Sequence, residues 1–141
     1  MIQRIQTVYL ILGIVALAAL LFIDRLWADP ALDAYGWFGP AVLALGGLVM
    51  LAAIAGIFTY KNRTQQKKIV LAAQYLTLLL ALVLYGGLYL ANALTVRTAE
   101  GIDVAMLIVL LLPIAGYVLF LMARRAIQKD IEKVKSMDRL R

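Results

Sequence analysis

Long apolar runs without a charged residue are the feature of this sequence that most restricts its fold. Charged residues are absent from Phe38–Tyr60, Ile69–Val96 and Val104–Ala123, and a fourth apolar run follows Arg4. An α-helix needs about 20 mostly apolar residues to cross the hydrocarbon core of a bilayer. A chain of 141 residues that is 65% hydrophobic cannot bury this much apolar surface in water. The sequence therefore predicts an integral membrane protein rather than a very apolar soluble helical bundle.

Turn residues between the runs predict an all-α protein with four transmembrane helices. The predicted spans are residues 5–26, 38–60, 69–94 and 102–123. A secretory signal peptide is the alternative for the first run, but the apolar stretch from Val8 to Ile23 is long for such a segment. Proline-containing turns precede the second span, and the loops are short. Short loops make neighbouring helices antiparallel, so residues 1–123 are predicted to form an up-down-up-down bundle.

The distribution of basic residues predicts which side of the membrane each end faces. Twelve of the fourteen lysines and arginines fall before the first span, in the loop Lys61–Lys68, or after residue 123. Arg25 and Arg97 fall on the other side. Cytoplasmic loops carry an excess of basic residues, so both termini are predicted to be cytoplasmic. The net charge of +6 requires no nucleic-acid partner, because basic residues at this surface also contact anionic lipid.

Missing residue types argue against catalysis. The sequence has no cysteine and no histidine, which excludes disulfides, thiol chemistry, histidine-held haem and the usual zinc sites. Apart from Asp103 at the outer end of the fourth, the three later spans also lack the charged side chains that proton-coupled transporters place inside the membrane. Small multidrug transporters share the four-helix plan but depend on a glutamate in the first helix, which this chain lacks. We therefore predict a protein that is not an enzyme and that holds no cofactor or metal.

A polar stripe on the third span is the most informative feature inside the membrane. At 100° per residue, its members share one face of the helix. They are Gln74, Thr77, Tyr85, Tyr89 and Asn92. Polar groups avoid lipid, so this face is expected to point at the other helices. The stripe either joins helices by hydrogen bonds or lines a groove for a lipid, a quinone or a small polar substrate.

Glycines and one proline predict details of the helix packing. Gly46, Gly47 and Gly56 on the second span, and Gly86-Gly87 on the third, allow close approach of helix backbones. Pro113 removes one backbone hydrogen bond in the middle of the fourth span, so a helix kink is expected there. A gate is one interpretation of such a kink, although prolines in transmembrane helices are common and usually static.

Residues 124–141 predict a basic, amphipathic, cytoplasmic helix that continues from the fourth span. Its apolar positions recur every three or four residues: Ile127, Ile131, Val134, Met137 and Leu140. This stripe predicts contact with the anionic membrane surface or with a partner protein. The residues predicted to make cytoplasmic partner or lipid contacts are Arg4, Gln6, Arg124, Arg125, Lys129, Asp130, Asp138 and Arg139.

Both ends of the chain resemble one known family. The stretches that carry the resemblance are Met1–Leu10, Arg125–Asp130, Val134–Ser136 and Asp138–Arg141. They resemble an uncharacterised membrane protein family of Bacteroidetes-type bacteria, domain-of-unknown-function 4293. Ile131 departs from its pattern, in which a second acidic residue follows Asp130. The resemblance implies four helices, a bacterial inner-membrane location and a cytoplasmic surface built from both ends. It implies no catalytic residue.

These features together predict a non-enzymatic accessory or scaffold subunit of a larger inner-membrane complex. Membrane lipids and other membrane protein subunits are the predicted partners. The absence of charge from the later spans, the polar face of the third span and the amphipathic tail favour this interpretation. The alternative is a small lipid- or solute-handling carrier that uses the polar face of the third span.

Overall fold

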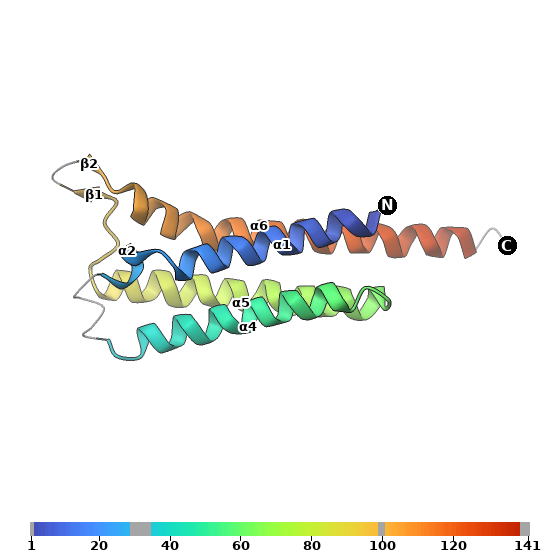
Figure 1. The fold of residues 1–141 in the computed structure, drawn as a ribbon, viewed down its shortest axis with the longest axis horizontal. Helices are drawn as coiled ribbons and strands as arrows, with labels where there is room; N and C mark the ends of the chain where they lie inside the picture. Colours follow the sequence, from blue (N-terminus) through green and yellow to red (C-terminus); the bar gives the residue numbers. More distant parts are fainter. Residues whose placement is uncertain (1, 29–34, 99–100, 139–141) are drawn as a thin grey trace.

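The computed structural model describes residues 2–28, 35–98 and 101–138, and these are mostly helical. The elements in chain order are α1 (Ile2–Leu21), α2 (Asp24–Trp27), α4 (Phe38–Phe58), α5 (Arg63–Leu90), β1 (Arg97–Thr98), β2 (Gly101–Ile102) and α6 (Val104–Asp138). Four long helices run beside one another along the molecule (Figure 1). The predicted all-α fold class is confirmed.

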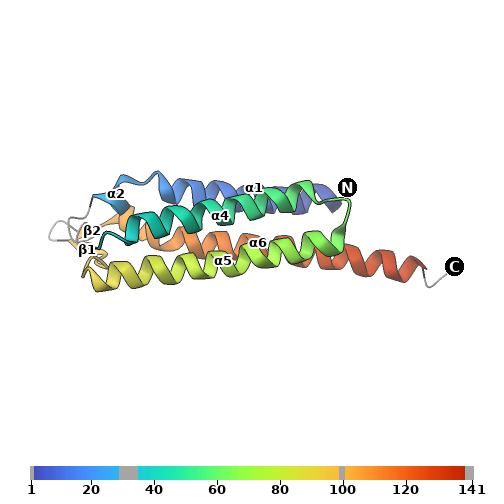
Figure 2. The ribbon, with the colours of Figure 1, turned by 90° about the horizontal axis from the view of Figure 1, so that it is seen from below.

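The long helices form a closed ring of neighbours. Helix α1 packs against α4 and α6, and α5 packs against the same two helices (Figures 1 and 2). The start of α1, the α4–α5 connection and the last part of α6 lie at one end, which we call the basic end (Figure 1). Helix α2 and the β1–β2 pair lie at the opposite end, which we call the hairpin end. Helix α6 projects beyond the rest of the bundle at the basic end.

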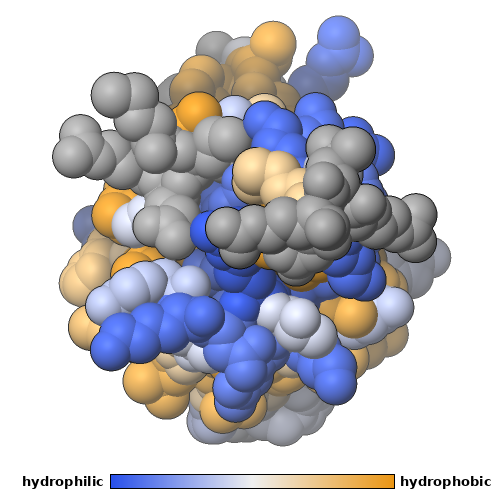
Figure 3. Space-filling model, turned by 90° about the vertical axis from the view of Figure 1, so that its right-hand side faces the viewer, coloured by the Kyte–Doolittle hydropathy of each residue, from blue (hydrophilic) through white to orange (hydrophobic). Residues whose placement is uncertain are grey.

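The outer faces of the helices are apolar. Exposed fractions of Val15, Leu51, Leu82 and Leu111 are 57%, 64%, 63% and 52%. A water-soluble bundle would carry polar residues at such positions. Helices α4, α5 and α6 are each long and apolar enough to cross a membrane, whereas α1 is apolar over the shorter stretch Ile5–Leu21. At the basic end, hydrophilic side chains gather in the middle of the face, with apolar side chains around the rim (Figure 3).

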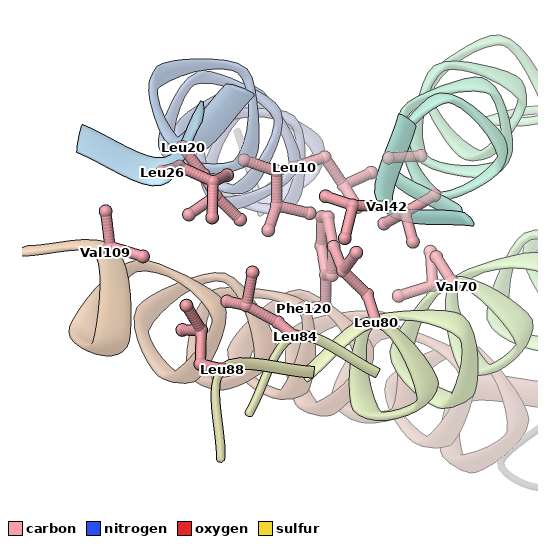
Figure 4. Packing of buried hydrophobic residues seen from close by; sticks show 14 of the residues in the cluster. Leu10, Leu20, Leu26, Val42, Val70, Leu80, Leu84, Leu88, Val109 and Phe120 are labelled. Atoms are coloured by element: carbon pink, nitrogen blue, oxygen red, sulfur yellow. The ribbon is translucent and has the colours of Figure 1, made fainter. Parts of the chain in front are cut away.

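Apolar side chains from all four long helices fill the interior. Leu10, Val42, Leu80 and Phe120 are fully buried and point toward one another (Figure 4). The close approach of α1 and α6 depends on Gly13, where a Cβ atom would lie 2.5 Å from the Phe120 ring. The core therefore relies on a small residue opposite a large one, the arrangement that gives dense packing.

The first helix is shorter than the predicted span 5–26, because α1 ends at Leu21. The N–H of Phe22 donates to the carbonyl of Ala19, only three residues back, which tightens the last turn. The indole Nε1 of Trp27 then donates to the Leu21 carbonyl at 2.9 Å. This bond satisfies a carbonyl that the helix end leaves without a helical partner. The chain continues as the separate short helix α2.

Helix α5 begins earlier than the predicted span 69–94. Asn62 caps its start, because the Asn62 Oδ1 accepts a hydrogen bond from the N–H of Gln65 at 3.1 Å. Most of the predicted basic loop Lys61–Lys68 is therefore the first turns of α5. This places basic side chains in fixed positions on a helix.

Helix α5 also ends earlier than predicted, at Leu90. Asn92 has a φ of 53°, in the left-handed region that asparagine tolerates better than most residues. The N–H of Ala93 then reaches back to the Leu88 carbonyl at 2.9 Å, and the N–H of Asn92 reaches Tyr89 at 3.1 Å. This pair of bonds is a Schellman motif, which terminates a helix.

Asp103 sets the start of α6. The helix begins at Val104, two residues after the predicted start at 102. One Asp103 oxygen accepts from the N–H of Met106 at 3.0 Å, which caps the helix. The other accepts from the Arg25 Nε at 2.8 Å, and this hydrogen bond holds the pKa of Asp103 below its ordinary value. The pair joins α2 to α6 at the hairpin end. The short antiparallel pair β1–β2 occupies the predicted loop from Arg97 to Gly101.

Helix α6 runs unbroken from Val104 to Asp138, through Pro113. The kink expected at Pro113 stays a prediction. Ile127 is fully buried and Asp130 is only 5% exposed. The packed bundle therefore continues past residue 123, where the sequence predicted the transmembrane domain to end, and takes in the first turns of the predicted tail.

Candidate functional site

Most of the described basic side chains lie at the basic end of the bundle. They come from the α4–α5 connection, the start of α5 and the second half of α6: Lys61, Arg63, Lys67, Lys68, Arg124, Arg125, Lys129, Lys133 and Lys135. Three buried polar side chains lie at the same end: Gln6, Gln66 and Asp130. The basic end is therefore the candidate functional site.

Asp130 is the centre of a buried polar network that joins three helices. Its Oδ2 accepts a hydrogen bond from the Gln6 Nε2 of α1 at 3.1 Å. The same oxygen lies 3.6 Å from an Arg63 guanidinium nitrogen of α5. A buried carboxylate without partners would be strongly unfavourable, so these contacts explain how α6 tolerates Asp130 in its packed face. The network fixes α1, α5 and α6 relative to one another.

Two further contacts strengthen this end of the bundle. The Lys67 Nζ of α5 donates to the Gln128 Oε1 of α6 at 2.6 Å. The buried Gln66 Nε2 donates to the Gly56 carbonyl at 2.9 Å. That carbonyl lies in the last turn of α4, where the helix itself supplies no donor. Arg63, Gln66 and Lys67 share one face of α5 because they are three and four residues apart.

A groove lies between α1 and α6 on the outer side of this network. Its volume is about 390 Å³, and it is lined by Ile5, Tyr9, Met122, Arg125, Ala126, Lys129, Asp130 and Lys133. The α1 side is contributed by Ile5 and Tyr9, while α6 contributes a basic row. Arg125, Lys129 and Lys133 are spaced four residues apart, so they lie along one side of α6. Its volume falls in the range of about 300–1,000 Å³ typical of small-molecule sites.

Comparison with known proteins identifies the family. The family model described as Domain of unknown function (DUF4293) matches residues 2–140. The chain belongs to this family. No curated protein and no solved structure matches it. The resemblance carried by the two ends is thus confirmed over nearly the full length of this DUF4293 protein.

The structure divides the predicted contact residues into two groups. Gln6 and Asp130 are buried and bond to each other, so their polar atoms serve the bundle interior. Arg125 and Lys129 are exposed and line the groove, and Arg124 is partly exposed beside them. Arg4 and Asp138 lie where only the helix backbone is described, and Arg139 lies outside the described residues.

Four polar residues of this DUF4293 site were not singled out from the sequence: Arg63, Gln66, Lys67 and Gln128. One signal in the sequence points toward them. Asp130 stands three residues after Ile127, on the apolar stripe of α6 rather than on its polar face. A carboxylate on a packed face requires a partner, and the basic start of α5 supplies one of them, Arg63.

The polar face of α5 is closed at its centre and open at the hairpin end. Gln74 and Thr77 are buried, and the Thr77 hydroxyl donates to the Ala73 carbonyl of its own helix. The Tyr85 hydroxyl donates to the Leu110 carbonyl of α6. Tyr89 and Asn92 do not point at the other helices as expected, because both are exposed in the structure. Asn92 lies beyond the helix end because the Schellman motif stops α5 at Leu90.

Proposed function

We propose that this DUF4293 protein is a non-enzymatic accessory subunit of a larger complex in the bacterial inner membrane. In this proposal the chain crosses the bilayer four times, both termini are cytoplasmic, and the projecting part of α6 contacts another membrane protein subunit. The observation that carries the proposal is the exposed end of α6, whose apolar side chains have no covering within the described bundle.

The shortness of α1 is compatible with a fourth crossing. A 20-residue helix is about 30 Å long, which equals the thickness of the hydrocarbon core. Outward side chains of α1 are apolar, with Val8 51% and Val15 57% exposed. Helix α1 also packs between α4 and α6, two helices that are long enough to span. A helix held in that position shares their surroundings.

The orientation follows from charge. The described basic residues concentrate at the basic end, whereas Arg25 and Arg97 lie at the hairpin end. Basic segments are retained on the cytoplasmic side during insertion. The basic end, with the start of α1 and the end of α6, is therefore assigned to the cytoplasm.

Cysteine labelling tests the orientation directly, because the natural chain has no cysteine. We expect Thr95→Cys, at the hairpin end, to react with an impermeant thiol reagent added to intact cells. Thr64→Cys, at the basic end, is expected to react only after the membrane is opened. Both threonines are exposed in the structure, so accessibility within the fold is matched. The reverse labelling pattern would contradict the assignment.

The projecting end of α6 carries apolar side chains into the cytoplasm. Residues 132–137 are all exposed, with Val134 at 41% and Met137 at 62%. Burying one such side chain is worth about 1.5–3 kcal/mol. Lys135 lies between them in sequence, so a partner surface with an apolar strip and an acidic flank fits this segment. A helix that projects beyond the bundle offers such a partner an exposed surface.

Replacement of Val134 and Met137 together by serine tests the accessory role. We expect the double variant to lose a partner that co-purifies with the natural protein from native membranes in mild detergent, while its own helix content and monomer stability stay unchanged. Ile102→Ser is the matched control, because Ile102 is 66% exposed at the hairpin end. Purification of the natural protein without any stoichiometric membrane subunit would count against the proposal.

The polar face of α5 supports the carrier alternative less well than the exposed end of α6 supports the accessory role. The polar groups at the centre of this face are not free to bind a substrate, because the hydroxyls of Thr77 and Tyr85 both donate to backbone carbonyls. Gln74 is 3% exposed, and its Oε1 accepts no hydrogen bond within the described residues. One unpaired amide oxygen is a modest feature compared with the polar or charged lining that substrate pathways in membranes use.

A further inference from the structure

We infer that the groove between α1 and α6 is a binding site for one anionic phospholipid, whose phosphate is held by Arg125, Lys129 and Lys133. The inference rests on the proposed membrane placement of the basic end, and it is independent of the accessory role. Three observations carry it: the basic side of the groove, its apolar side, and its position where the uncharged part of α6 ends.

The basic side chains of the groove have no acidic partner within the described part of the chain. Within the described part of the chain, the side chains of Arg125, Lys129 and Lys133 make no hydrogen bond or ion pair. Their four-residue spacing gives a row of cations along α6. Asp130 is the acidic residue of the lining, but its carboxylate already accepts from Gln6 and lies beside Arg63. The groove therefore presents net positive charge to a phosphate.

The apolar side of the groove continues into the membrane-facing surface. Ile5 is 51% exposed and Met122 is 39% exposed, so both have surface left to cover. On α1, Leu12 follows Ile5 by seven residues and is also exposed. On α6, the exposed Val118 precedes Met122 by four residues. These spacings keep each pair on one helix face, which gives an acyl chain a continuous apolar track.

The position of the groove favours a lipid over a soluble anion. Charged residues are absent from Val104 to Ala123, and the basic row begins two residues later. Met122 and Arg125 thus place the groove across the boundary between hydrocarbon and headgroup. A soluble phosphate compound would use the basic side alone and leave the apolar side uncovered, whereas a phospholipid covers both.

The experiment measures lipid retention by native mass spectrometry of the purified full-length protein. Phosphatidylglycerol and phosphatidylcholine are added separately in mild detergent. We expect the natural protein to retain phosphatidylglycerol preferentially. The triple variant Arg125→Gln, Lys129→Gln, Lys133→Gln is expected to lose about tenfold or more of that retention, since it removes the three basic side chains that attract the anionic headgroup.

A second triple variant controls for total charge. Lys61→Gln, Lys68→Gln and Arg97→Gln remove the same number of positive charges from exposed positions outside the groove. This variant is expected to retain phosphatidylglycerol as the natural protein does. Ala126→Phe fills the groove without a change of charge and is expected to lower retention. Equal losses in the two triple variants, or no loss in either, would overturn the inference.

Inorganic phosphate distinguishes a lipid from a soluble anion. We expect millimolar phosphate to leave bound phosphatidylglycerol in place, because it lacks the apolar contacts. Displacement by phosphate alone would mean that the groove takes a free anion, and the lipid inference would fail. The labelling of Thr64→Cys and Thr95→Cys is repeated in the groove variant, so that a failure of membrane placement is seen separately from a failure of lipid binding.

Discussion

Replacing Gly87 with alanine is expected to destabilise the bundle by about 1–3 kcal/mol, whereas the same change at the neighbouring Gly86 is expected to be neutral or slightly stabilising. A Cβ atom at Gly87 would lie 2.2 Å and 2.3 Å from two ring carbons of Phe38. Such distances cannot be accommodated without moving the ring of a fully packed side chain. Nothing lies within 4 Å of a Cβ at Gly86.

The two glycines provide a matched pair, because they are adjacent on α5 and the change is identical. Alanine is intrinsically favoured over glycine in a helix by about 0.8–1.0 kcal/mol in soluble hosts, so Gly86→Ala shows that background term. Unfolding by titration with sodium dodecyl sulfate, followed by helical circular dichroism, measures both variants. Equal effects at the two positions would contradict the close packing of Phe38 of α4 against Gly87 of α5.

A second substitution tests the mechanism. Phe38→Leu shortens the side chain that opposes Gly87, so it is expected to reduce the cost of Gly87→Ala. The double variant should therefore be more stable than the sum of the two single effects predicts, by about 0.5–3 kcal/mol for residues in contact. Strict additivity would show that the destabilisation has another origin.

The helices were predictable from sequence because the apolar runs leave few alternatives, but their ends were decided by local hydrogen bonds. The Asn62 side chain extends α5 backward into the predicted basic loop. Asn92 stops the same helix by adopting a left-handed conformation. Hydrophobicity alone does not predict these ends, because α5 begins six residues before the charge-free run Ile69–Val96 and ends six residues before the run does. The end of α1 is likewise set by a hydrogen bond rather than by hydrophobicity, because the indole of Trp27 donates to the Leu21 carbonyl six residues earlier.

The candidate site was predictable only in part, because its contacts join residues far apart in the chain. The sequence identified Gln6 and Asp130 at the two ends, yet they are 124 positions apart and nothing local indicates that they bond. Arg63 enters the network only because Asn62 starts α5 early enough to turn it toward α6. The groove likewise needs both α1 and α6 in place. The periodicity of the sequence predicts which residues share a helix face, whereas tertiary packing decides which helix faces contact one another.

Replacing Asp130 with alanine is expected to cost about 1–3 kcal/mol of stability, because it leaves the buried amide of Gln6 without its acceptor. The contribution of Arg63 is expected to be smaller. Its guanidinium is one-third exposed and lies 3.6 Å from the carboxylate, so water screens the pair. Asp130→Asn keeps an oxygen that can accept from Gln6 and removes the charge. We expect asparagine to cost less than about 1 kcal/mol.

The comparison of alanine with asparagine separates the hydrogen bond from the ion pair. Detergent unfolding gives the stability of both variants, and Gln6→Ala combined with Asp130→Ala completes a double-mutant cycle. A coupling energy of about 0.5–3 kcal/mol is expected between these contacting residues. If asparagine costs as much as alanine, the charge and its pairing with Arg63 stabilise this end of the bundle. If asparagine is tolerated, it is the hydrogen bond between α1 and α6 that stabilises this end of the bundle. That bond then also maintains the groove between the two helices.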